Sequence, residues 1–293
     1  MTARFDGLRF SCVVDFLRVN VELPRTTQGW TLQEHVGAQY ADPKDKGPGG
    51  AATKFLMTYN CPKSWSEVQA SLDKISATYG LAREPQVAEM EVAFDAFDGV
   101  GNRERLGQLT HDFFRYTTHH PSHNKRLQPQ YDKSDPATRR WPIGAEHKFA
   151  PEVNRLLKEG GTLYVGDDDE PVGQRYYLKT TDKGGDLKLR PSEWRARMEV
   201  TLRAMDGGLP FSTIEEARGF KFETLTKLGF RFRLPKDLPA VEHRMTSFAR
   251  AIKPTRGLPG KFGRRKFDPE LMADRELNEK ARNALRGLTR RMS

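Results

Sequence analysis

Three acidic side chains interrupt the apolar segment Val87–Phe97 at positions that could hold a metal ion. Glu89, Glu91 and Asp95 have the same parity, so on a β-strand they point to one face. Carboxylates brought together repel one another unless a cation lies between them or their pKa values rise, and carboxylate oxygens are the ligands that Mg²⁺ and Mn²⁺ prefer. The pattern indicates either a divalent metal site or an exposed sheet face without a ligand.

A second segment, Trp194–Leu202, combines acidic and basic residues on one face of a predicted strand. Its alternation aligns four polar residues: Arg195, Arg197, Glu199 and Thr201. A carboxylate beside guanidinium groups suits a site for a metal ion and a phosphate, but cross-strand ion pairs explain the same residues. Glu199 is therefore a further candidate metal ligand.

Motifs for several other chemistries are absent. Gly257–Lys261 lacks the spacing of a phosphate-binding loop, and Gly99–Gly101 is not followed by the third glycine of a dinucleotide fingerprint, so ATP and NAD chemistry have no support. The histidines of His119–His123 flank a proline and are interpreted as a surface loop. Cys12 and Cys61 are too far apart for a CxxC site and are interpreted as reduced thiols.

The order of predicted strands and helices is typical of an α+β protein. Ser64 and Glu67 form a capping box that opens a helix ending at Gly80. Connections of about nine to twelve residues between the later strands suit antiparallel neighbours. We expect a curved antiparallel sheet with helices packed on one face and a helical C-terminal part. The predicted strands are 10–23, 87–97, 162–165, 175–181 and 194–202; the predicted helices lie at 106–114, from the Ser212–Glu215 capping box to 252, and within 268–291.

Positive charge is concentrated at the C-terminus of the chain. The 293 residues include 49 Lys and Arg against 39 Asp and Glu, a net charge of +10, and residues 253–293 supply +7 of it. A basic segment broken by Pro and Gly would follow phosphates, so nucleic acid is the first partner to consider. We expect a sheet-based domain over 1–205, a helical part over 206–252 and a basic tail over 253–293.

Hydrophobic segments in the sequence are short. No run approaches the roughly 18 to 20 apolar residues of a membrane span, and Met1–Asp6 already contains charged residues where a signal peptide would need an apolar core. The expectation is a cytoplasmic protein with no membrane partner.

Four short segments form an ordered set in the first two thirds of the chain. They are Val14–Val19, Glu89–Asp98, Thr162–Gly166 and Arg197–Leu202. Together they resemble the replication initiation factor family (Rep_trans type) of rolling-circle plasmid initiators and related nickases of integrative elements and filamentous phages. Its pattern is Arg-apolar-Asp-apolar-Ala-Phe-Asp, then Tyr-x-Gly, then a strand ending Tyr-Asn/Asp-Lys, then Arg-x-Glu-apolar-x-Leu. The resemblance covers residues 10–205.

The resemblance implies a metal-dependent enzyme that nicks an origin and transfers one DNA strand by attack of a tyrosine on a phosphate. Glu91 and Asp95 match the acidic metal-site pair of the family, with Glu91 standing where Asp is usual, and Glu199 matches the acid of the Arg-x-Glu strand. Mg²⁺ or Mn²⁺ is the implied cofactor. A phenol with a pKa near 10 is a weak nucleophile, so a cation is expected to polarise the phosphate.

The tyrosine position is where this chain departs from the family. Thr181, followed by Asp182, occupies the expected nucleophile position. Tyr177 lies four residues earlier on the same strand face, roughly 13 Å away, and Tyr176 points to the opposite face. Tyr177 is the first candidate nucleophile and Tyr176 the second, while Tyr164 matches the structural tyrosine of Tyr-x-Gly.

The expected partner is origin DNA, single-stranded or cruciform, with a host helicase and a second copy of the chain as further partners. Two alternatives stay open. One is a non-enzymatic origin-binding or copy-control protein of the same family, favoured by Thr181; the other is an RNA-binding protein with an open sheet, although no Gly-Phe-x-Phe pattern lies on a central strand. The expected DNA contacts are Arg175, Lys179, Lys183, Arg195, Arg197, Arg264, Arg265 and Lys266.

Overall fold

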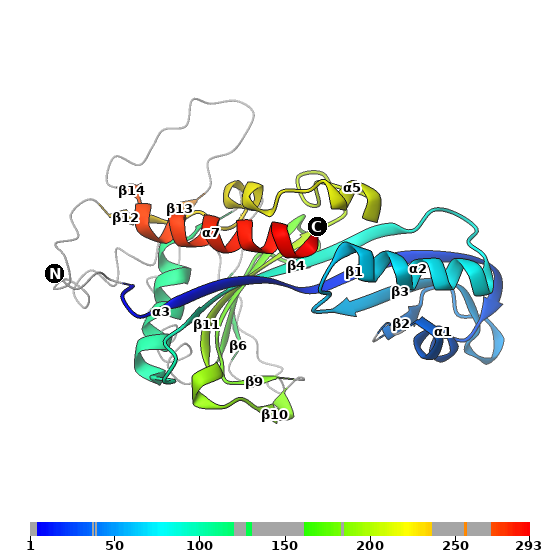
Figure 1. Ribbon diagram of the computed structural model, residues 1–293, viewed down its shortest axis with the longest axis horizontal. Helices are drawn as coiled ribbons and strands as arrows, with labels where there is room; N and C mark the ends of the chain where they lie inside the picture. The colour runs from blue at the N-terminus through cyan, green and yellow to red at the C-terminus, as the bar shows by residue number, and fades with distance from the viewer. Residues whose placement is uncertain are drawn as a thin grey trace. The chain divides into compact units, whose positions relative to one another are not determined.

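The computed structural model has an α+β architecture built on an open antiparallel sheet, as predicted. It describes residues 5–36, 38, 40–119, 127–130, 161–182, 185–235, 255–256 and 271–293. Figure 1 shows the long strands β1, β4 and β11 of the main sheet. Its eight strands are, from edge to edge, β2 (Tyr40–Pro43), β3 (Ala52–Asn60), β1 (Arg9–Thr27), β4 (Gln86–Phe97), β11 (Arg195–Arg203), β8 (Val172–Lys179), β7 (Thr162–Val165) and β6 (Leu127–Gln130).

The strands β7 and β8 are antiparallel neighbours, as the short connection between them predicted. The pairs β2–β3, β1–β3, β7–β8 and β6–β7 are all antiparallel. Shorter paired strands lie outside the main sheet: β9 (Thr181–Asp182) with β10 (Leu187–Lys188), β12 (Arg233–Pro235) with β14 (Leu271–Ala273), and β5 (Thr118–His119) in parallel with β13 (Thr255–Arg256).

The chain divides into two compact units. The first comprises residues 1–12, 93–200 and 223–285, and the second residues 13–92, 201–222 and 286–293. The strands β1, β4 and β11 contribute residues to both units. The domain boundaries expected at 205 and 252 stay predictions.

Aromatic side chains form the core of the first unit. Phe94 of β4 contacts Phe113 of α3 (Arg103–Tyr116) at 5.2 Å between ring centroids, and Phe232 at 6.1 Å. All three rings are fully buried. Burial of such rings is the main favourable contribution to folding here, and it fixes β4 against α3.

The turn that follows β4 is fixed by one carboxylate. Asp98 accepts hydrogen bonds from the backbone N–H groups of Val100, Gly101 and Asn102. Gly101 has a φ of +76°, and a Cβ at this position would lie 2.5 Å from the carbonyl oxygen of Pro191, so only glycine fits. The turn therefore fixes the end of β4 close to the 3₁₀ turn Pro191–Glu193 that precedes β11.

In the second unit, α1 (Gly29–Val36) and α2 (Trp65–Tyr79) pack together near β3. The predicted N-cap is confirmed, because Ser64 Oγ accepts a hydrogen bond of 3.1 Å from the backbone N–H of Glu67. The reciprocal contact of the predicted capping box differs, since the Glu67 carboxylate accepts its hydrogen bond of 2.8 Å from the backbone N–H of Lys63. Ser71 Oγ donates to the carbonyl oxygen of Val36 and lies 3.1 Å from the Tyr59 hydroxyl. These hydrogen bonds connect α1, α2 and β3 through the buried Ser71 hydroxyl.

The capping box predicted at Ser212 and Glu215 is wrong by one residue. Thr213 is the N-cap of α5 (Ile214–Arg218), and its Oγ1 accepts a hydrogen bond of 3.2 Å from the backbone N–H of Glu216. Burial decides between the two registers, because Ile214 is 3 % exposed and Ala217 fully buried. The helix has five residues and is followed by the 3₁₀ turn Phe222–Lys227, and residues 236–254, which include the rest of the predicted helical part, lie outside the described part of the chain.

The helix predicted within residues 268–291 is confirmed as α7 (Arg275–Met292). It begins later than expected because Leu271–Ala273 form β14, after which Asp274 Oδ1 accepts a hydrogen bond of 3.0 Å from the Leu277 N–H. The apolar face of the helix is buried. Among the described residues, α7 and every other helix are too short or too polar to cross a membrane.

Candidate active site

Asp95 and Arg197 form a bidentate ion pair between β4 and β11. Arg197 Nε donates to Asp95 Oδ1 over 2.6 Å, and Nη2 donates to Oδ2 over 2.7 Å. The side chains are 3 % and 2 % exposed. Burial alone would lower the pKa of Arg197, but the charge and hydrogen bonds of Asp95 outweigh it and hold that pKa well above its ordinary value.

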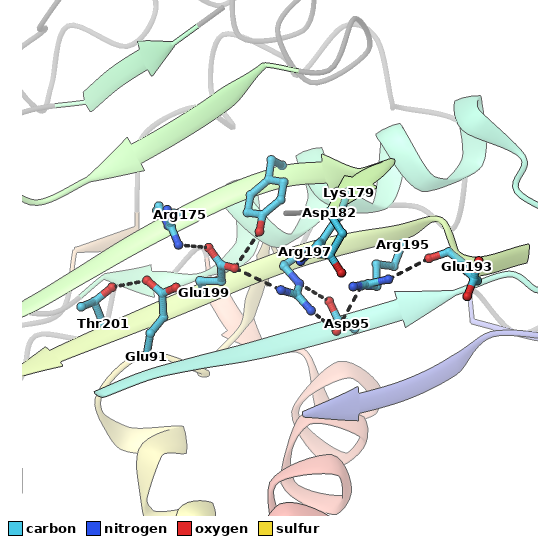
Figure 2. Close-up of polar contacts among 11 residues, drawn as sticks. Glu91, Asp95, Arg175, Lys179, Asp182, Glu193, Arg195, Arg197, Glu199 and Thr201 are labelled. Carbon is cyan, nitrogen blue, oxygen red and sulfur yellow. Dashed lines mark hydrogen bonds and ion pairs between the residues drawn. The ribbon is translucent and has the colours of Figure 1, made fainter. Parts of the chain in front are cut away.

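Glu199 lies on the same face of β11 as Arg197 and is fully buried. Its Oε1 accepts hydrogen bonds from Arg197 Nη1, at 3.3 Å, and from the Tyr177 hydroxyl of β8, at 2.7 Å. Its Oε2 lies 2.7 Å from Arg175 Nη2, in an ion pair whose geometry is not that of a hydrogen bond. Figure 2 shows Arg197 contacting both Asp95 and Glu199, with Arg175 on the far side of Glu199.

Tyr177 is half-buried, and its pKa lies well above the ordinary value of a phenol. Burial is the largest cause, and the negative charge of Glu199 adds to it, whereas Arg197 and Arg175 act in the opposite direction. At neutral pH Tyr177 is therefore a protonated phenol that donates to Glu199. It is a poor nucleophile until its proton is taken up.

Tyr176, the second candidate nucleophile, lies in the core. It is fully buried, its hydroxyl donates to Gln174 Oε1 over 3.0 Å, and its ring meets Phe114 edge-on at 5.5 Å. Burial raises its pKa above the ordinary value. The period of two along β8 thus directs Tyr176 and Tyr177 to opposite faces, and only Tyr177 reaches Glu199.

A group of three carboxylates could hold a cation. Asp15, Glu91 and Glu199 each offer one oxygen, and these oxygens all lie within 4.8 Å of one another. Three acidic oxygen ligands fit the preference of Mg²⁺ and Mn²⁺, and Oε2 of Glu199 accepts no hydrogen bond from the described residues. Glu91 is 2 % exposed and accepts a hydrogen bond of 2.6 Å from Thr201 Oγ1 (Figure 2).

The metal set expected from the sequence differs from this group in one member. Asp95 is not among the three acids whose oxygens converge, and both of its oxygens receive hydrogen bonds from Arg197 instead. Asp15 takes part instead and was not predicted. The buried positions of β1 alternate up to Val14, and the alternation resumes one position later, at Leu17. Asp15 lies at this break, and an acid at a break in an apolar strand is the signal that could have identified it.

The four predicted DNA contacts that lie within the described residues are all engaged in ion pairs: Arg175, Lys179, Arg195 and Arg197. Arg195 Nε lies 3.5 Å from Asp95 Oδ2, and Lys179 Nζ lies 3.1 Å from Asp182 Oδ1. Arg175 is 32 % exposed and is the arginine beside Glu199 that solvent reaches. The predicted contacts Lys183, Arg264, Arg265 and Lys266 lie outside the described residues.

Glu89, the third acid of the predicted β4 face, is engaged separately in the second unit. Arg18 Nη1 donates to Glu89 Oε2 over 2.6 Å, and Arg203 Nε lies 3.2 Å from Oε1. Glu89 is therefore an ion-paired residue of the sheet face and is not in the group of three carboxylates.

Comparison with known proteins yields a structural similarity. No family model and no curated protein matches the chain. Among solved structures, the chain is similar to a rolling circle replication initiator protein from Geobacillus stearothermophilus, with 14% sequence identity and a TM-score of 0.38 over 85% of this chain and 98% of that chain. Similarity at this level assigns no residue a role.

Proposed function

We propose that this chain initiates rolling-circle DNA replication by nicking one strand of an origin, with Tyr177 as the nucleophile. The observation that carries the proposal is the 2.7 Å hydrogen bond from the Tyr177 hydroxyl to the buried carboxylate of Glu199. Glu199 also belongs to the group of carboxylates that fits a divalent cation. A candidate nucleophile, a proton acceptor and candidate metal ligands thus lie together, and the segments that contain the three acids occur in the order that the resembled family shows.

The chemical step is a transesterification. The Tyr177 oxygen attacks the scissile phosphorus, its proton passes to Glu199, and the bond from phosphorus to the DNA 3′ oxygen breaks. The 3′ oxygen takes up the proton that Glu199 received, directly or through a water molecule, and leaves as a hydroxyl, so a 5′-phosphotyrosyl bond replaces one phosphodiester bond. A divalent cation held by Asp15, Glu91 and Glu199 would neutralise charge on the non-bridging phosphate oxygens.

Two arginines beside Glu199 would position the groups that take part in this step. Arg197 holds the Glu199 oxygen that receives the proton, and Arg175 is exposed enough to meet a DNA phosphate. A preorganised donor costs no reorganisation when charge develops on the phosphate. Because the pKa of Tyr177 is high, the phenol must pass its proton to a base as it attacks the phosphate. Glu199, which already accepts the hydrogen bond of the phenol, is positioned to be that base.

The experiment is covalent capture of labelled DNA. The full chain is incubated with Mn²⁺ and a pool of single strands, labelled either at the 3′ end or at the 5′ end. Because the tyrosine retains the 5′ phosphate of the downstream fragment, only 3′-labelled strands should label the protein. Tyr177→Phe should abolish the adduct, and the matched control Tyr164→Phe on neighbouring β7 should retain it.

The non-enzymatic alternative is a DNA-binding protein of the same family, favoured by Thr181 at the usual tyrosine position. It predicts that the wild-type chain retards the same strands in a gel and forms no adduct. An adduct that persists in Tyr177→Phe would instead move the nucleophile to another tyrosine.

A further inference from the structure

Asp95 differs from the other acids of the candidate site because it forms a bidentate ion pair with one arginine, Arg197. Each of its two oxygens receives one nitrogen of Arg197, at 2.6 Å and 2.7 Å, and the pair is almost completely shielded from water. Bidentate bonds to a guanidinium fix both partners in one plane. Both oxygens of Asp95 are therefore directed at the Arg197 guanidinium, whose positive charge opposes a cation at the same place.

Arg197 transmits this restraint to the reacting groups. Its remaining terminal nitrogen, Nη1, donates over 3.3 Å to Oε1 of Glu199, which is the oxygen that receives the Tyr177 hydroxyl. Arg197 and Glu199 are two residues apart on β11, so the strand directs both to one face. A series of contacts thus runs from Asp95 through Arg197 and Glu199 to Tyr177.

We propose that Asp95 is a positioning residue that acts through Arg197 on Glu199 and Tyr177, and that it is not a ligand of the metal ion. The inference rests on the proposed function, and it reassigns the acid that the sequence pattern places in the metal pair. Without Asp95, the Arg197 guanidinium would be a buried charge with one partner fewer, free to rotate toward Glu199. The bond between Glu199 and Tyr177 would then lose its fixed geometry.

Mn²⁺ binding tests the reassignment without reference to activity. Free and bound Mn²⁺ are measured by electron paramagnetic resonance on the full chain and on single variants. Asp95→Asn, which removes no candidate ligand, should bind Mn²⁺ within about threefold of the wild type, whereas Glu91→Gln, which removes one of the three converging carboxylates, should bind at least about tenfold more weakly. Glu89→Gln is the matched control, since Glu89 shares the strand and face of Asp95 and is also paired with arginines. Loss of Mn²⁺ affinity in Asp95→Asn equal to that in Glu91→Gln overturns the proposal.

Adduct formation tests the positioning role. The loss of a metal ligand can be compensated by more metal, so it raises the half-saturating Mn²⁺ concentration. The loss of a positioning residue instead lowers the rate that remains at saturating Mn²⁺. We expect the maximal rate of Asp95→Asn to fall at least about tenfold with unchanged half-saturation. Because Asp95 acts through Arg197, the double variant Asp95→Asn/Arg197→Gln should be no slower than Arg197→Gln alone. Additive losses, or rescue of Asp95→Asn by Mn²⁺, contradict the inference.

The variants also separate the inference from the proposed function. If the wild-type chain forms no adduct, the nicking proposal fails, while the Mn²⁺ comparison still decides whether Asp95 is a ligand. If Asp95→Asn alone does not fold, the double variant removes both buried charges together and is expected to fold. Retained Mn²⁺ affinity in that variant supports the reassignment, and lost affinity refutes it.

Discussion

Tyr177 and Glu199 are 22 residues apart in the sequence and on different strands, yet their side chains share a hydrogen bond of 2.7 Å. The bond joins β8 to β11 on the face that also carries Arg197. It makes the phenol a donor to a carboxylate with no exposed surface. This geometry, rather than the position of Tyr177 in the sequence, makes it the candidate nucleophile.

Replacement of Glu199 should have a large effect on activity. Glu199→Gln removes the proton acceptor of Tyr177 and one of the three carboxylates that fit a cation. We expect the rate of adduct formation to fall by about 10² or more, because a positioned base and a metal ligand are lost together. Gel quantification of adducts at fixed Mn²⁺ measures the effect. The control is Glu193→Gln, which removes a charge paired with Arg190; a Glu199→Gln rate within threefold of the control would refute the role of Glu199.

The corrected cap of α5 can be tested by unfolding. Thr213→Ala removes the side chain that accepts the Glu216 N–H, so the free energy of unfolding should fall by about 1 kcal/mol. Ser212→Ala, one residue earlier, should change it by less than about 0.5 kcal/mol, since Thr213 provides the cap. Urea denaturation followed by circular dichroism gives both values. The reverse order of effects would restore the cap that the sequence pattern suggested.

Stability should decrease in alkaline solution because of a buried tyrosine in the second unit. Burial raises the pKa of Tyr59 to about 12, against an ordinary value of 10, with the Ser71 hydrogen bond acting in the opposite direction. Above pH 10 the unfolded chain releases this proton while the folded chain keeps it. The stabilisation is therefore present below pH 10 and is lost as the pH rises from 10 to 12.

Denaturation at two pH values tests this linkage. Between pH 9 and pH 11 the wild-type chain should lose about 1 kcal/mol more stability than Tyr59→Phe, which has no phenol to ionise. Tyr40→Phe, at a residue that is 61% exposed, should follow the wild type. Equal losses in Tyr59→Phe and wild type would show that Tyr59 does not titrate differently on unfolding.

Periodicity along single strands predicted part of the site correctly. The alternation of β11 places Arg197, Glu199 and Thr201 on one face, and in the structure Arg197 donates to Glu199 while Thr201 donates to Glu91. The strands at β4 and β7 and the helix α2 likewise follow from apolar spacing and a capping residue. These are local signals, which the sequence contains in full.

Pairing between distant segments could not be predicted in the same way. That Arg197 would meet Asp95, 102 residues away, depends on the register of two neighbouring strands, which composition does not encode. Asp15 was missed for the same reason, since its oxygen meets those of Glu91 and Glu199 only through the pairing of distant strands. At α5, Ser212 with Glu215 and Thr213 with Glu216 have the same spacing, and only the burial of Ile214 distinguishes them.

The two arginines on Glu199 differ in their access to water, and this difference implies an order of events. Arg197 is 2 % exposed and is held by Asp95, whereas Arg175 is 32 % exposed. An arriving strand would compete with Glu199 for the outer guanidinium only. Binding of DNA to Arg175 would thereby release Oε2 of Glu199, while Arg197 would continue to hold Oε1. The arrival of DNA would itself free the Glu199 oxygen that the proposed cation needs.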